Sequence, residues 1–148
     1  MVLKKGENMD YRINYKEETK DLSREDVTWK IHYVTDDSDT MKDYMCDCHT
    51  HGLEDIFGME LQIVLKLPMD LCCYVLNSIG YLGLKGYRFA AEDKIYGLFQ
   101  NIDMPVRIIL GVDANNGPIL RVWMPDEECR VDSTASGMYG RQDENPYR

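Results

Sequence analysis

The residue types that could carry chemistry are concentrated in one short stretch of this chain, "CDCHTH" at residues 46–51. It contains two of the five cysteines, Cys46 and Cys48, and two of the three histidines, His49 and His51. Zinc takes cysteine thiolates and histidine imidazoles in proteins, usually four around one ion in a tetrahedron. By composition alone, the stretch therefore predicts a zinc site or a pair of reactive thiols.

The expected local structure argues against a single four-ligand site. Residues 44–53 alternate as a strand does, and alternate side chains of a strand point to opposite faces. Cys46 and Cys48 then face one way, and Asp47, His49 and His51 face the other. The two cysteines also lack the two-residue spacing of a zinc knuckle. A regular strand cannot place all four ligands around one ion.

A narrower metal hypothesis remains, because the third histidine lies on the preceding predicted strand, residues 27–35. If the two strands form a hairpin, His32 can lie near Asp47 and His49 on a shared polar face; a slip of one residue would move it to the other face. Three imidazoles, or two with Asp47, would leave an open position, as in catalytic or transport zinc sites. The alternative is a polar face whose histidines, His51 included, bind nothing.

The thiol face has two interpretations as well. Cys46 and Cys48 can fill the core as small apolar side chains, or they can act as a reactive redox pair, for which their spacing is unusual. An odd number of cysteines without a regular framework favours the reducing cytoplasm.

The rest of the chain predicts an α+β domain. Strands are expected at 27–35, 44–53, 59–67, 104–113 and 118–126, the last two joined by the hairpin signal Asn116-Gly117, and the less regular residues 87–103 could form a strand, a turn and a strand. A helix should begin at Pro68 and end among the glycines at 80–86. The simplest arrangement is a mainly antiparallel sheet of five or six strands with one principal helix on one face. Residues 1–26 are expected to be a mobile arm, 27–126 the domain, and 127–148 an extended tail docked on it.

Composition limits the partners. The formal net charge of -9 argues against binding to nucleic acid or to an anionic membrane surface. No apolar run approaches the roughly 20 residues of a membrane span, and the first residues lack a secretory signal. The partners that composition leaves open are another protein or a second copy of this chain in a homodimer.

Several motifs occur in an order that resembles a known family: "THGL", "ELQIVLKLP", "YVLNSIG", "PVRIILGV", "PILRVWMPD" and "PYR". Over residues 28–148 the chain is similar to the bacterial domains of unknown function called DUF4262. The resemblance implies a compact cytoplasmic α+β domain and no established activity. Family members often carry a strand such as "YTVGL" in place of "HTHGL", which assigns Thr50, Gly52 and Leu53 to the fold and the histidines to a subgroup.

Two functional hypotheses follow. The first is a small cytoplasmic binding or interaction domain without a catalytic constellation. The second is a metal-binding protein or metal-dependent enzyme that uses His49 and His51 with His32 or Asp47, and zinc as the cofactor.

Overall fold

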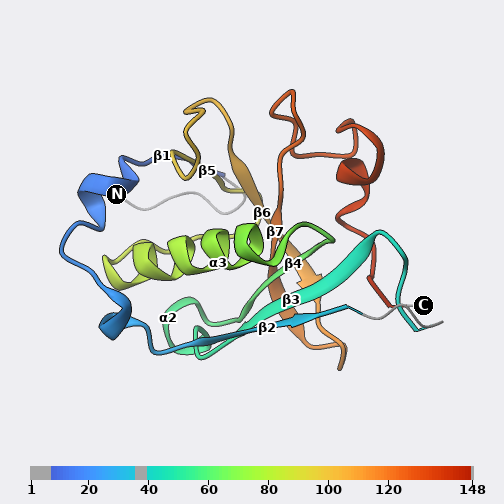
Figure 1. Cartoon of the computed structure of the whole chain (residues 1–148), viewed down its shortest axis with the longest axis horizontal. Coiled ribbons are helices and arrows are strands. Elements are labelled where there is room, and N and C mark those ends of the chain that lie inside the picture. The colour runs from blue at the N-terminus through green and yellow to red at the C-terminus, as the bar shows by residue number, and fades with distance from the viewer. Residues whose placement is uncertain (1–7, 36–39, 148) are drawn as a thin grey trace.

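Seven strands and one long helix form the framework of the computed structural model, which describes residues 8–35 and 40–147 (Figure 1). The strands are β1 (Asp10–Arg12), β2 (Lys30–Val34), β3 (Met45–His51), β4 (Leu61–Leu65), β5 (Lys94–Tyr96), β6 (Val106–Val112) and β7 (Pro118–Trp123). The helices are α1 (Tyr15–Glu18), η1 (Arg24–Asp26), α2 (Glu54–Phe57), α3 (Met69–Leu84) and η2 (Gly137–Arg141).

The strands form one mixed sheet in the order β1-β5-β6-β7-β4-β3-β2. The α+β class and the single principal helix are confirmed, but the sheet has seven strands where five or six were expected, and it is mixed, with four of its six neighbouring pairs antiparallel. Two pairs, β1 with β5 and β4 with β7, are parallel. Parallel neighbours need a long connection, and here α3, β5 and β6 all lie between β4 and β7 in the chain. The additional strand is β1, which belongs to residues 1–26, the segment expected to be a mobile arm. Residues 1–7 of that segment lie outside the described part of the chain.

Helix α3 covers one face of the sheet (Figure 1). Its buried stripe consists of Cys72, Val75, Leu76, Ile79 and Leu82, at the spacing of a helix that packs on one side. The helix starts directly after Pro68 and, as expected, ends among the glycines at 80–86, running past Gly80 and Gly83 to Leu84. A Cβ on Gly80 would lie 2.5 Å from Cζ2 of Trp29, so a glycine is needed for the close approach of the indole.

Both expected hairpins are present. β2 and β3 pair antiparallel with His32 opposite His49, and β6 and β7 pair antiparallel around a turn at 113–117. In that turn Asn116 has a positive φ of 62°, which asparagine tolerates better than most residues. Between residues 87 and 103 the structure forms the single strand β5 in place of two.

The second face of the sheet holds the polar side chains of His49, Gln62 and Arg121 beside a small apolar cluster of Ile109, Trp123 and Val131, and the chain that follows β7 covers part of it. Gln142 is buried there and its side-chain amide forms two hydrogen bonds, both of 2.7 Å, with the backbone of Met124. Farther along, Tyr147 forms an isolated antiparallel bridge with Met41. Within the described ranges, no helix has the length and apolar character that crossing a membrane requires.

Candidate metal centre

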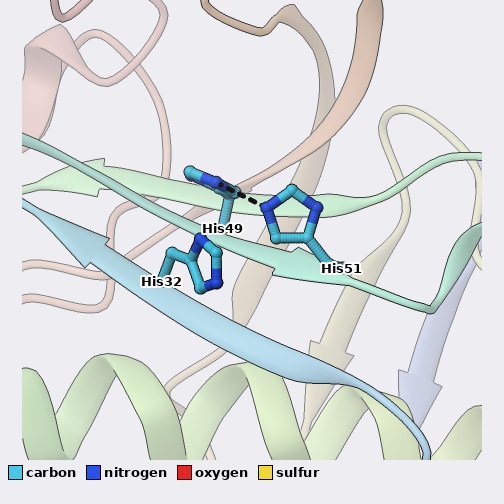
Figure 2. A group of neighbouring side chains, drawn as sticks. All are labelled: His32, His49 and His51. Atoms are coloured by element: carbon cyan, nitrogen blue, oxygen red, sulfur yellow. Dashed lines mark hydrogen bonds between the residues drawn. The ribbon is translucent and has the colours of Figure 1, made fainter.

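The β2–β3 hairpin brings all three histidines of the chain together on the polar face (Figure 2). His32 lies opposite His49, and His51 follows His49 by two residues on the same side of β3. The ring centroids are 4.5 Å apart for His32 and His51, 4.9 Å for His49 and His51, and 5.6 Å for His32 and His49. The register on which the metal hypothesis depended is therefore the one that the structure adopts.

The nitrogen positions suit a first-row metal ion. Nε2 of His49 and Nε2 of His51 are 3.2 Å apart, and two nitrogens each about 2.0–2.1 Å from a tetrahedral zinc ion lie roughly 3.3–3.4 Å apart. One ring nitrogen from each of the three histidines falls within 4.8 Å of the others. Because His32 is exposed, its ring can rotate and close the remaining gap without disturbing the core.

Asp47 orients His49 from behind. Its Oδ1 lies 2.9 Å from Nδ1 of His49, and an ionised carboxylate only accepts hydrogen bonds, so Nδ1 carries the proton. The other nitrogen, Nε2, then has its lone pair directed toward His51. Metal-binding histidines commonly have such a carboxylate on the distal nitrogen, because it selects the tautomer and increases the basicity of the ligand.

The charge states of this pair follow from its surroundings. Burial by itself raises the pKa of Asp47, but hydrogen bonds from His49, Tyr147 and Gln62 outweigh it and lower the pKa to about 2. The same hydrogen bond to Asp47 raises the pKa of His49, against the opposing effect of burial. Both carboxylate oxygens of Asp47 are occupied by these donors. The sequence had offered Asp47 as an alternative metal ligand. The structure instead places it behind the histidines, as a partner of His49.

A buried polar row continues from the site across the sheet. Gln62 is opposite His49 and beside Arg121. Nε of Arg121 donates to Oε1 of Gln62 at 2.9 Å, and Nε2 of Gln62 donates to Oδ1 of Asp47 at 3.0 Å. Gln62 and Arg121 are almost completely buried, so the guanidinium and the carboxylate neutralise one another through the amide between them.

Sequence reasoning missed Gln62 and Arg121. The available signal was a single polar residue inside each of two apolar strands, "LQIVL" and "PILRVW". Such residues face water on many sheets, so the strand pattern alone could not distinguish a buried network from an exposed edge.

A cleft of about 330 Å³ opens beside His49 and His51, and the β6–β7 turn forms its opposite wall. Two of its acidic residues, Glu60 and Asp113, are engaged by backbone donors. Glu60 accepts hydrogen bonds from the backbone of Gly52, Leu53 and Glu54, which shapes the turn after β3. In the β6–β7 turn, Oδ1 of Asp113 accepts from the backbone N–H groups of residues 115 and 117. An ion held by the histidines would therefore face an open cleft whose walls are held in place by these hydrogen bonds.

The thiols lie on the other side of the sheet. Cys46 and Cys48 are fully buried against α3, which confirms that the strand separates them from the histidines. A hydrogen bond with Cys72 and then burial raise the pKa of both thiols. A raised pKa and burial both disfavour the reactive thiolate, so these features support the packing interpretation over the redox one.

Comparison of the chain with protein-family models, with curated proteins and with solved structures finds no match. The resemblance to DUF4262 therefore stays a prediction, and the functional argument is based on the geometry of the histidine site.

Proposed function

We propose that the protein binds one divalent transition-metal ion, zinc in the first instance, through His32, His49 and His51. The observation that carries the proposal is the set of three ring nitrogens within 4.8 Å of one another. Imidazole suits zinc, copper, iron and nickel, whereas calcium and magnesium prefer oxygen ligands. The ligand set consequently favours the first group of ions.

The bond between Asp47 and His49 supports the same proposal independently. Solvent alone could satisfy an exposed imidazole, yet His49 has an ionised and almost completely buried partner at 2.9 Å. This partner holds the ring with Nε2 toward the other two histidines. Three protein ligands beside a cleft would leave a position for water or a ligand, as in catalytic zinc sites and unlike closed structural ones.

Calorimetric titration of tag-free, metal-stripped protein tests the proposal. We expect one zinc ion per chain with an affinity tighter than micromolar, and zinc in the protein as purified by elemental analysis. His49→Ala should weaken binding by more than the roughly 10–100-fold that loss of an outer-shell partner causes.

Cys129→Ser is the matched control, because Cys129 is a partly exposed thiol that could otherwise account for zinc binding. It should bind zinc as the wild type does. Absence of saturable binding, or equal binding by His49→Ala, would refute the proposal. The expectations of a non-catalytic interaction domain, a homodimer and a cytoplasmic location stay predictions.

A further inference from the structure

We propose that Tyr147 is a positioning residue for the metal site, and that docking of residues 142–147 and binding of the metal ion strengthen one another. This inference rests on the proposed function. The phenol of Tyr147 bonds to Asp47 and not to the histidine nitrogens that would bind the ion. It acts on them through Asp47.

The contact that carries the inference joins residues 100 positions apart in the chain. The phenol of Tyr147 donates a hydrogen bond to Oδ2 of Asp47, while Oδ1 accepts from His49 and Gln62. Among the described residues, Tyr147 donates to Oδ2 and so helps to fix the rotation of the carboxylate. The rotation of the carboxylate in turn determines where the ring of His49 lies.

The backbone of the same segment is held by the polar row. Nη1 of Arg121 donates to the carbonyl oxygens of Gln142 and Glu144 at 3.3 and 3.0 Å. Arg121 also holds Gln62, and Gln62 holds Asp47. The docked segment therefore contacts the site at two points, through the phenol and through the guanidinium.

The end of the segment is fixed against the loop that leads into β3. The N–H of Lys42 donates to the carbonyl of Pro146 at 3.0 Å, and the phenol of Tyr44 donates to Oε1 of Glu144 at 2.8 Å. In Figure 1 the two chain segments approach one another at this end of the sheet. These contacts place Tyr147 beside Asp47 and restrict its movement.

Undocking of the segment would remove a donor from Asp47 and two acceptors from Arg121, both of which are buried. The carboxylate would then hold His49 less firmly, and outer-shell losses of this kind cost roughly 10–100-fold in metal affinity. Coupling between two binding events is reciprocal by thermodynamic necessity. The metal ion must therefore stabilise the docked segment by the same factor by which the segment strengthens binding.

Tyr147→Phe tests the inference, because it removes one hydroxyl and keeps the ring. Tyr139→Phe is the matched control, since Tyr139 precedes the same segment and packs against the core. We expect Tyr147→Phe to bind zinc about tenfold more weakly, the lower end of the outer-shell range, and to change the visible absorption of the cobalt-substituted protein. Tyr139→Phe should change neither.

Amide hydrogen exchange measures the reciprocal effect. Zinc should slow exchange of residues 142–147 in the wild type and should do so less in Tyr147→Phe. If wild-type protein binds zinc but Tyr147→Phe has the same affinity, the same cobalt spectrum and the same zinc-dependent protection, the positioning role is refuted and the metal site survives. If wild-type protein binds no zinc, the proposed function fails and the inference fails with it.

Discussion

Replacing Asp47 by asparagine would isolate the effect of the charge at the centre of the buried network. Asp47→Asn preserves the shape of the side chain and one carbonyl oxygen, which still accepts from His49 and Gln62. The new amide NH₂ faces the phenol of Tyr147, and a phenol can accept as well as donate. The substitution therefore removes the negative charge with little loss of packing.

The magnitude follows from the pKa of Asp47. After the opposing effect of burial, hydrogen bonds led by that from His49 lower it from the ordinary 3.8 to about 2. At about 1.36 kcal/mol per pKa unit, ionised Asp47 contributes about 2 kcal/mol to the free energy of unfolding at pH 7. Because the folded-state pKa is the lower one, this contribution is present above the unfolded-state pKa and is lost as the pH falls toward 2. About 1 kcal/mol should remain at pH 3.

Urea unfolding of the metal-free proteins at pH 7 and pH 3 measures both values. We expect Asp47→Asn to be less stable than the wild type by about 2 kcal/mol at pH 7 and by about 1 kcal/mol at pH 3. Asp103→Asn, the same change at an exposed turn, should stay within about 0.5 kcal/mol of the wild type at both values. Equal stability of Asp47→Asn and wild type at pH 7, or a difference that does not change with pH, would refute the reasoning.

Three further predictions concern the site and the core. Asp47 raises the pKa of His49, so the histidine should begin to take up a proton above the ordinary histidine pKa of about 6.5 as the pH is lowered. Zinc affinity, measured by competition with a chromophoric chelator, should begin to fall at that same pH. An affinity that does not change between pH 8 and pH 6 would contradict this. Arg121→Met should lower the free energy of unfolding by about 3 kcal/mol, because it leaves Asp47 without its buried counter-charge, and a loss below about 1 kcal/mol would show that the network is not energetically connected. Gly80→Ala should cost about 1–3 kcal/mol in thermal unfolding, since its methyl group would overlap Trp29, and wild-type stability would disprove the close packing.

Strand periodicity was enough to predict the two faces of β3. Alternation along residues 44–53 separated Cys46 and Cys48 from His49 and His51, and the structure places them on opposite sides of the sheet. The preceding strand was also predictable, because its β-branched and aromatic residues alternate around His32. These predictions succeeded because both elements are neighbours in the chain, and a hairpin between neighbours has few alternative partners.

The order of the strands in the sheet could not be predicted, because it depends on pairings between segments that are far apart in the chain. β1 has three residues and no alternating apolar pattern, and it becomes a strand only because β5 offers an open edge. The parallel pairing of β4 with β7 spans the whole of α3, β5 and β6. Such pairings depend on which surfaces remain to be buried once the local elements exist, and short segments do not encode that outcome.

By itself, then, the sequence determined the content of the candidate site: three histidines, and the strand period that puts them on one side. Tertiary structure alone decided the role of Asp47, which became the buried partner of His49 when Gln62 and Tyr147 arrived from other parts of the chain. The physical reason is that a ligand type is a property of one residue, whereas the orientation and charge of that ligand depend on the groups that folding places behind it.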